Sequence, residues 1–332
     1  MTQLDATDRQ IQLAAQMELE WRRCESDFFY WVERYWHILK PPTGRQLFKP
    51  RPQQVEVLNI WLEGNHSVSL KARQIGWSTT VACYSFWQAF FHTDYRCMVL
   101  SKGERESIEL LSYAVFGYKL LPEWMKARNP RTDEAQQKMT FSNGSQIVSL
   151  PSSNNPARGY TGNLVVCDEF AFLTNPEESW AAIEPVADIG GQLIILSTAS
   201  GSGNMFHGMW TKAVIGASSF VPSFYGWWAV PERDQEWYDR KKADLPAWQL
   251  AQEYPDNPEE AFIKSGNMVF PHDIVAAIRS REPRRTLSMS PAGDLVPDSN
   301  GQIKIWEEPV HGEPYVMGVD TAEGLGHGDY SV

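Results

Sequence analysis

The sequence lacks cysteine pairs at metal-binding spacing. Its four cysteines lie far apart and form no C-x-x-C pattern; they are Cys24, Cys83, Cys97 and Cys167. Isolated cysteines of this kind are typical of reduced core residues in a cytosolic protein. The sequence therefore predicts neither a cysteine-held metal nor a disulfide framework.

A signal peptide, a membrane span and an excess of positive charge are absent as well. The N-terminus is polar and acidic, unlike a secretory signal. The longest apolar stretch, 81–91, is interrupted by Ser85 and Gln88 and is too short to span a bilayer. The formal net charge of −11 excludes a protein that is basic over its whole surface. Contact with nucleic acid must therefore come from a local patch, or from a part of the protein outside this sequence.

The chain has enough apolar residues for a large core. Its 332 residues, 42% of them hydrophobic, predict two domains or one large domain with an appendage. Residues 8–37 predict an amphipathic helix that packs on the domain, because apolar residues recur there at steps of three and four. These residues are Leu13, Met17, Trp21, Cys24, Phe28, Trp31 and Tyr35. The turn residues of 41–44 end this N-terminal helical segment, which we place at 1–45.

A phosphate-binding loop is predicted directly after an apolar run at 68–70. The usual pattern is G-x-x-x-x-G-K-[ST], in which backbone N–H groups and a helix N-terminus hold the phosphates. Gly76 and Ser78 match the pattern, Lys71 stands at the first glycine, and Trp77 replaces the usual lysine. The residues expected to contact the nucleotide are Lys71, Ala72, Arg73, Gln74, Ile75, Gly76, Trp77, Ser78 and Thr79.

The phosphates need a cation, and position 77 does not supply one. We expect Lys71 or Arg73 to supply it from the start of the loop, and the sequence leaves the choice between them open. The alternative is an ordinary strand–turn–helix connection. Gln54 precedes the loop at the start of a predicted helix, and an amide there can read an adenine edge, although a surface glutamine is the simpler interpretation.

Two carboxylates end the next apolar run, 163–169. At the carboxyl end of a strand Asp168 can hold Mg²⁺, and Glu169 can deprotonate the attacking water. Arg158 lies on a Gly-flanked loop just before and is a candidate arginine finger; the alternative is a solvated arginine. A further apolar strand ends at Ser197, Thr198 and Ala199, whose hydroxyls are placed to sense a γ-phosphate.

The remaining chain predicts further elements. We expect a strand at 96–101, a helix at 104–121 and a hairpin at 138–149 around Asn143-Gly144. From 217 the composition shifts to a cluster of tryptophans, with short helices at 234–242 and 247–253, which predicts a small helical subdomain. Residues 281–302 are rich in Pro, Ser and Gly and predict a linker. Residues 314–320 predict a strand ending at Asp320; the chain stops inside the strand after it, which suggests a truncated form.

Together these motifs resemble the large terminase subunit of tailed bacteriophages, the motor that packages viral DNA into the capsid. The resemblance covers nearly the whole chain, and the order and spacing of the motifs carry it. The matching segments are 71–78 (KARQIGWS), 157–160 (ARGY), 164–169 (LVVCDE), 197–199 (STA), 254–262 (YPDNPEEAF), 265–266 (SG) and 318–320 (GVD). Trp77 departs from members that keep a lysine at that position.

The resemblance implies an α/β fold: a P-loop ATPase core with a mainly parallel sheet flanked by helices, and a helical lid. It places the core at 46–215, the lid at 216–280, and a linker with the first nuclease strand at 281–332. The implied cofactors are ATP and Mg²⁺. Arg158 falls where family members carry a trans-acting arginine finger, Ser197, Thr198 and Ala199 form the coupling motif, and Asp320 matches the first metal ligand of the nuclease.

The resemblance also implies the partners. They are double-stranded DNA, the portal protein and procapsid, and the small terminase subunit, without a membrane. A homo-oligomeric ring forms on the capsid, in the cytoplasm of the infected bacterial host; the state in solution, a monomer included, is left open. Two-metal cleavage needs several converging carboxylates. Only Glu323 and Asp329 follow Asp320, so we expect this chain to hydrolyse ATP without cutting DNA.

Two other functions fit parts of the pattern. A helicase-like, DNA-dependent ATPase would share the Asp-Glu pair, the preceding glutamine and the Ser-Thr-Ala strand end, but the sequence shows no complete second motor domain. A nucleotide-binding scaffold that only assembles would share the loop and would not turn over ATP. Strand displacement tests the first alternative, and steady ATP turnover tests the second.

Overall fold

The structure is a computed structural model of the chain. It describes residues 6–133, 135–151, 161–262, 282–290, 293–299 and 301–312. Two units divide the chain, residues 1–266 and 267–332, and each is described by itself.

Seven strands form the central sheet of the first unit, in the order β5-β6-β4-β7-β8-β3-β9. All neighbouring strands are parallel except β5, which is antiparallel to β6. The strands are β3 (Ser67–Lys71), β4 (Arg96–Ser101), β5 (Lys138–Thr140), β6 (Gln146–Pro151), β7 (Leu164–Asp168), β8 (Gln192–Ser197) and β9 (Val221–Tyr225). The strands predicted at 68–70, 96–101, 163–169 and 192–199 and the hairpin predicted at 138–149 are confirmed, whereas the strand predicted at 314–320 lies outside the described residues. Because β3, β7 and β8 are buried along their whole length, they read as near-continuous apolar runs.

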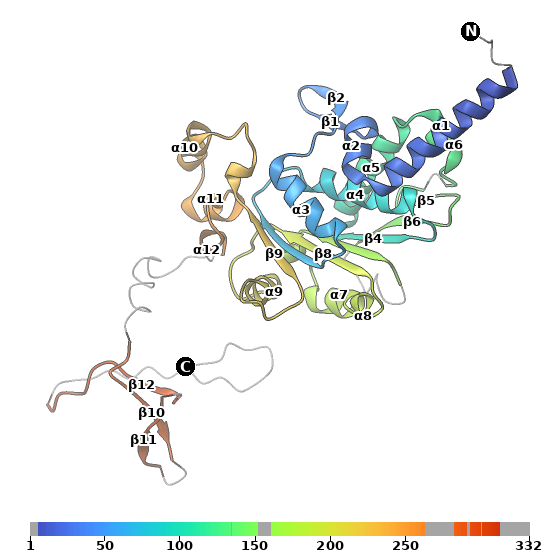
Figure 1. Ribbon diagram of the computed structural model, residues 1–332. Coiled ribbons are helices and arrows are strands. Elements are labelled where there is room, and N and C mark those ends of the chain that lie inside the picture. The colour runs from blue at the N-terminus through green and yellow to red at the C-terminus, as the bar shows by residue number, and fades with distance from the viewer. Residues whose placement is uncertain are drawn as a thin grey trace. The chain divides into compact units, whose positions relative to one another are not determined.

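Helices cover both faces of this sheet (Figure 1). One layer contains α2 (Phe28–Tyr35), α3 (Pro52–Leu62), α4 (Trp77–Phe91) and α5 (Glu104–Lys119), followed by α6 (Glu123–Arg128). The other contains the 3-10 helix η1 (Phe170–Phe172), α7 (Pro176–Ile183), α8 (Pro185–Asp188) and α9 (Met205–Val214). Each layer packs its own apolar cluster against the sheet, so the predicted fold class is confirmed.

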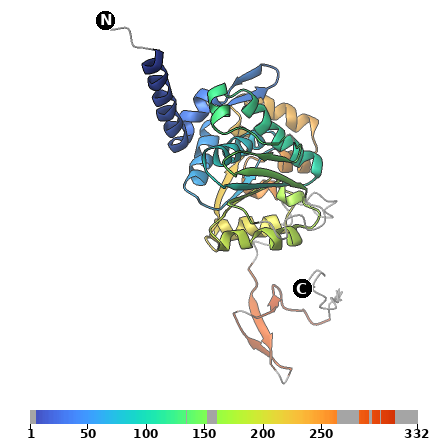
Figure 2. The same cartoon turned by 90° about the vertical axis from the view of Figure 1, so that its right-hand side faces the viewer.

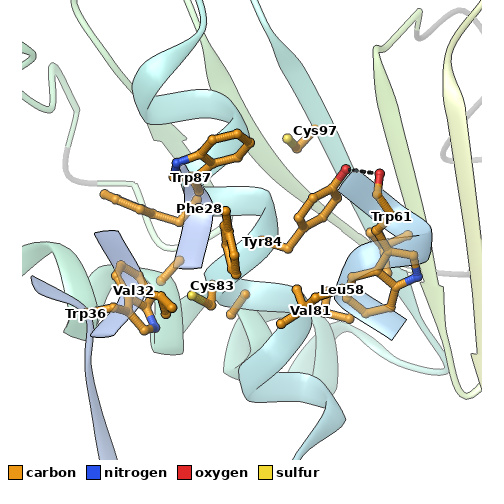
Figure 3. Packing of buried hydrophobic residues seen from close by; sticks show 14 of the residues in the cluster. Phe28, Val32, Trp36, Leu58, Trp61, Val81, Cys83, Tyr84, Trp87 and Cys97 are labelled. Carbon is orange, nitrogen blue, oxygen red and sulfur yellow. Dashed lines mark hydrogen bonds between the residues drawn. The ribbon is translucent and has the colours of Figure 1, made fainter. Parts of the chain in front are cut away.

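Helix α4 is the centre of the larger cluster and is buried on nearly all sides. A helix that is apolar all round belongs in a core rather than at a surface. Phe86 of α4 contacts Trp31 and Trp36 of the N-terminal segment, with ring centroids 5.9 and 4.7 Å apart. Figure 3 shows the neighbouring part of this cluster, where α2 and α3 face α4. The helix that follows the phosphate loop is therefore held rigidly by aromatic packing.

A buried polar cluster ties α4 to α3 and β8. The Tyr84 hydroxyl lies 2.8 Å from the Trp61 carbonyl oxygen, a contact drawn in Figure 3, and 2.8 Å from Oε1 of Gln192. Gln88 Nε2 donates to the same hydroxyl, and Gln192 Nε2 donates to the Trp61 carbonyl. Buried polar groups are costly unless paired, and this cluster pairs them across three elements.

The N-terminal segment differs from the single helix predicted for 8–37. The structure has α1 (Ala6–Ser26) and α2, separated at Asp27, whose side chain accepts a bond from the Tyr30 N–H and caps α2. The chain then forms a hairpin of β1 (His37–Lys40) and β2 (Gly44–Leu47). The predicted packing along the whole segment is also wrong: Ile11 and Leu13 are exposed, and α1 extends away from the neighbouring helices at its start (Figure 2).

The lid is smaller than the range predicted for it. Strand β9 falls inside 216–280, yet it pairs with β3 as the edge of the main sheet. Its sequence is short and contains Pro222, which weakens the strand signal and is tolerated at a sheet edge. The predicted short helices are confirmed as α10 (Gln235–Asp244) and α11 (Ala247–Glu253), beside η2 (Trp227–Ala229) and α12 (Pro258–Ala261). Trp227, Leu250 and Tyr254 form their separate core.

The second unit contains strands where a linker was predicted. β10 (Arg285–Met289) is antiparallel to both β11 (Leu295–Pro297) and β12 (Ile303–Ile305). The linker prediction for 281–302 is wrong here because Pro, Ser and Gly punctuate the strands rather than replace them. Gly301 shows this: a Cβ there would lie 2.2 Å from the Leu287 carbonyl oxygen, so the close approach requires glycine.

None of the helices in the described ranges combines the length and the apolar character needed to cross a membrane.

The buried polar cluster generates a stability prediction. Tyr84→Phe removes the hydroxyl and leaves buried partners unpaired, so we expect a loss of about 1–3 kcal/mol in the free energy of unfolding. Urea denaturation followed by circular dichroism should show a lower midpoint at an unchanged slope. The matched control is Tyr113→Phe, because Tyr113 donates only to exposed Glu109 on its own helix and should change little. Equal midpoints for both variants would contradict this account of the cluster.

Candidate active site

The predicted phosphate loop follows β3 and ends at the first turn of α4. Gly76 has φ +86°, a conformation that glycine adopts readily, and Gln74 also lies in the left-handed region at φ +57°. The Ala72 N–H donates to the Tyr225 carbonyl and the Arg73 N–H to the Glu253 carbonyl. The N–H groups of residues 74–79, in contrast, form no hydrogen bond with a backbone carbonyl of the described residues. They include the free amides of a helix N-terminus, so the loop is built to receive an anion.

Trp77 occupies the position of the usual lysine but faces the core. Its side chain is buried, with ring centroids 4.8 Å from Tyr225 and 6.4 Å from Trp61. The departure from the usual loop pattern is therefore a core-packing residue, and the phosphate-binding cation must come from elsewhere.

Lys71, the last residue of β3, is a cation at the start of the loop that faces two carboxylates. Its Nζ lies 2.7 Å from Oε1 of Glu169 and 3.8 Å from Oδ1 of Asp168. The sheet order explains the geometry: β8 lies between β3 and β7, so only a long side chain from β3 can reach the carboxylates that end β7. The two motifs, about ninety residues apart in the sequence, thus form one buried cluster.

Burial and charge oppose one another in this cluster. Burial alone would lower the pKa of Lys71, but Glu169 and Asp168 outweigh it, so the pKa of the ammonium is raised. Burial also acts to raise the pKa of Glu169; Lys71 and Thr198 outweigh it, and that pKa is lowered. For Asp168 burial prevails over the attraction of Lys71, and its pKa is raised. Lys71 is therefore charged, and Glu169 is a carboxylate able to accept a proton.

Ser78 and Asp168 fit the predicted Mg²⁺ site. The Ser78 hydroxyl donates to Oδ2 of Asp168 at 3.2 Å, which brings a hydroxyl and a carboxylate to one point beside the loop. Among the described residues there is no group of three or more His, Cys, Asp or Glu side chains placed to hold a metal. Mg²⁺ prefers few protein oxygens, together with water and phosphate oxygens, so this donor set suits it.

The end of β8 contacts Glu169. The Thr198 hydroxyl donates to Oε2 of Glu169 at 3.2 Å, and Ser197 Oγ accepts a bond from the Ala171 N–H at 3.1 Å. Ala199 is fully buried in the apolar cluster between the sheet and the layer of η1, α7, α8 and α9. Glu169 itself has φ +54°, which is uncommon for a residue other than glycine and is a strained conformation often found at functional sites. The predicted coupling motif therefore holds the predicted base in place.

Gln54 does not have the surroundings predicted for it. Its side chain is 5% exposed; Oε1 accepts a bond from the Arg51 N–H, and Nε2 donates to Thr80 Oγ1 and to the Gly76 carbonyl. Both amide hydrogens are thus used inside the protein, and the prediction that this amide reads adenine is not supported. Gln54 instead braces the loop against α3 and α4.

Arg73 is directed toward the lid and not toward the two carboxylates of β7. Its Nη1 lies 2.9 Å from Oε2 of Glu253, and its side chain is 58% exposed. Lys71 is therefore the cation beside Asp168 and Glu169, whereas Arg73 contacts α11.

Two residues that contact the loop, Arg233 and Arg51, were missed from the sequence, as was Glu232, which pairs with Arg51. Arg233 Nη2 donates to the Gln74 carbonyl at 3.3 Å, and its guanidinium lies over the rings of Trp237 and Tyr254. Arg51 Nη1 donates to the Ile75 carbonyl at 3.4 Å. Glu232 accepts a bond from Arg51 at 3.3 Å. A run of alternating charges at 232–234 was the only sequence signal, and it does not identify partners more than 150 residues away.

Two predicted site residues, Arg158 and Asp320, lie outside the described residues.

The fold and the site together are typical of a nucleoside triphosphatase: a loop that leads into a helix N-terminus, a buried lysine, a hydroxyl, and a carboxylate pair at the end of β7. Comparison with known proteins agrees. The family model "Terminase large subunit, T4likevirus-type, N-terminal" matches residues 68–263, more than half of the chain. The chain therefore belongs to the large terminase subunits, the ATPases of viral genome packaging.

Two solved structures share the fold. The ATPase domain of the large terminase of Thermus phage P74-26 has 21% identity and a TM-score of 0.54, covering 65% of this chain and 95% of that chain. The large terminase of bacteriophage HK97 has 15% identity and a TM-score of 0.59, covering 80% of this chain and 62% of that chain. The present chain thus spans about three fifths of the HK97 protein.

The position of the cation can be tested by two substitutions. Lys71→Ala should lower ATP turnover by about 100-fold or more, because a charge-stabilising group is removed from the site. Adding Trp77→Lys to this variant restores the usual pattern but should not restore turnover, because position 77 faces the core. Steady-state phosphate release measures the rates, and circular dichroism checks folding. Recovery in the double variant would show that position 77 can reach the phosphates.

Trp77→Lys alone should mainly affect stability. Loss of a buried tryptophan costs about 3–5 kcal/mol in the free energy of unfolding. A urea titration of the purified variant measures this cost. A midpoint equal to that of the parent chain would mean that Trp77 is not the core residue described here.

Proposed function

We propose that the first unit is the motor domain, with Lys71 binding the β- and γ-phosphates of ATP, Glu169 acting as general base, and Ser78 and Asp168 holding Mg²⁺. The observation that carries the proposal is the position of the Lys71 ammonium, 2.7 Å from Glu169 and 3.8 Å from Asp168. It lies where a loop with free N–H groups meets the two carboxylates. Phosphoryl transfer depends on such positioning and charge stabilisation.

The ion pair between Lys71 and Glu169 suggests how ATP prepares the site. A triphosphate on the loop competes for the ammonium and draws it away from Glu169. Lys71 is the main cause that lowers the pKa of Glu169, so its departure makes the carboxylate a stronger base, which then accepts a proton from the attacking water. When bound, Mg²⁺ would neutralise part of the phosphate charge from the side of Ser78 and Asp168.

Thr198 connects this chemistry to the sheet. Its hydroxyl donates to Glu169, and the residue directly follows β8, which lies between the strand before the loop and the strand that ends at the carboxylates. A shift of Glu169 upon loss of the γ-phosphate therefore breaks or bends a contact with β8. We propose that Ser197, Thr198 and Ala199 pass the hydrolysis step to the rest of the domain in this way.

The family membership supports a wider proposal for the whole protein. The motor would form a homo-oligomeric ring on the portal protein and move double-stranded DNA into a procapsid. The small terminase subunit would be a further partner, and packaging would take place in the cytoplasm of the infected host. Arg158 would complete the site of a neighbouring subunit, and Asp320 would begin the metal site of a nuclease. The family match over residues 68–263 supports the motor assignments, and Asp320 lies outside the matched residues.

The different roles of the two carboxylates predict different effects when each is substituted. Glu169→Gln keeps its shape but loses the base, so it should bind ATP normally and hydrolyse it about 10²–10⁴-fold more slowly. Asp168→Asn should instead raise the Mg²⁺ concentration needed for half-maximal turnover. Turnover across a Mg²⁺ titration, together with binding of a fluorescent ATP analogue, separates the two effects.

The control is Glu177→Gln, because this carboxylate lies in the first turn of α7, outside the site. Its turnover and Mg²⁺ requirement should match those of the parent chain. If both active-site variants also behaved like the parent, Glu169 and Asp168 would have no part in hydrolysis. Assays with and without duplex DNA, together with a strand-displacement assay, distinguish the packaging motor from a helicase.

A further inference from the structure

The segment 34–51 is strongly basic in an otherwise acidic chain. It carries Arg34, Lys40, Arg45, Lys49 and Arg51 and no Asp or Glu, whereas the whole chain has a net charge of −11. It runs from the end of α2 through the β1–β2 hairpin to the start of α3. We name residues 37–49 the basic hairpin; the nucleotide site uses none of its side chains.

The basic hairpin has an inner and an outer face. Ile38, opposite Gln46, packs against the large apolar cluster, and Phe48 is buried, so these residues mark the inner face. Side chains alternate along a strand. The outer face therefore carries Leu39 and Arg45, which lie opposite one another and are both exposed. Lys49, two residues beyond the end of β2, is exposed as well.

The cations of the segment divide in the same way. Lys40 and Arg51 both pair with Glu232 of the lid, at 2.8 and 3.3 Å. Arg45 and Lys49 form no ion pair with a carboxylate in the part of the chain that the structure describes. The inner cations thus serve the fold, while the outer ones have no such use.

Neighbouring elements extend the positive face. The Arg34 guanidinium lies 3.8 Å from the Tyr30 ring centroid and is exposed to solvent. Leu39 of the outer face and Pro41 line a cavity of about 470 Å³ together with residues of α5, among them Lys119. Lys119 is exposed as well, so further cations lie near the hairpin.

We propose that the outer face of the basic hairpin binds the phosphate backbone of double-stranded DNA. An acidic chain repels DNA overall, so contact must use a local surface where cations are not neutralised, and Arg45 and Lys49 provide one. Each such contact releases counterions from the duplex and favours binding. This inference rests on the proposed function and identifies the surface that the motor would use.

The position of the hairpin suits a motor. Its inner cation Lys40 pairs with Glu232, and Glu232 also pairs with Arg51, which donates to the Ile75 carbonyl of the phosphate loop. DNA bound to the outer face would thus lie next to contacts that join the lid and the loop. A DNA surface remote from the lid would have no such connection.

The test measures the salt dependence of DNA binding. The chain is titrated against a fluorescein-labelled duplex, and anisotropy gives the affinity from about 50 to 200 mM salt. Arg45→Gln with Lys49→Gln should weaken binding at least tenfold. It should also reduce the slope of log K against log[salt] by about 0.9 for each phosphate that is no longer neutralised, roughly 1.8 in total. Arg45→Lys with Lys49→Arg keeps both charges and should retain the slope.

The matched control removes two cations elsewhere. Arg240→Gln with Lys242→Gln on α10 makes the same change in net charge and should leave the slope unchanged, since Arg240 is already paired with Glu236. Urea midpoints and sedimentation are measured for every variant. They separate loss of DNA binding from loss of folding or of self-association.

Each outcome decides the proposal. A parent chain that does not bind the duplex overturns the proposed DNA motor and this surface with it. A parent that binds while the hairpin variant keeps the same affinity and slope overturns the surface alone. A hairpin variant that loses only self-association shows a protein interface instead of a DNA surface, and also overturns the inference.

Discussion

One buried ammonium, that of Lys71, stabilises a site in which two carboxylates would otherwise repel one another. Asp168 and Glu169 are neighbours in the chain, and both are withdrawn from water. Two carboxylates in such a place cannot both stay charged without a cation between them. Breaking a buried pair leaves an uncompensated charge, so the loop, β7 and the end of β8 depend on this one side chain.

Much of the site could be predicted because its signals are local. Lys71 and Asp168 each end a short apolar run, and strands of that kind lie parallel in a sheet whose carboxyl ends meet at one edge. What failed was the direction of individual side chains. The sequence position of Gln54 suggested that its amide binds adenine. In the structure the amide is buried and donates instead to Thr80 and to the Gly76 carbonyl. Nothing in the sequence reveals that competition.

Prediction of the fold succeeded and failed for similar reasons, because only local signals can be read from the sequence. Parallel strands buried on both faces gave clear apolar runs, whereas β9, an edge strand with a proline, and the short strands of the second unit did not. Composition also misled for 281–302, where turn-forming residues stand between short strands. The contacts of Arg233 with the loop and of Glu232 with Arg51 join residues more than 150 positions apart, and a single sequence shows no such pairing.

Strand β8 has a consequence beyond its hydrogen bonds. Because it lies between β3 and β7, it sets the spacing of their backbones: neighbouring strands are about 4.8 Å apart, so the ends of β3 and β7 are held about 10 Å apart. A long side chain is needed to span this distance, and Lys71 spans it to reach Glu169. A short residue at position 71 could not make that contact, so the width of the sheet sets the length of side chain that the site requires.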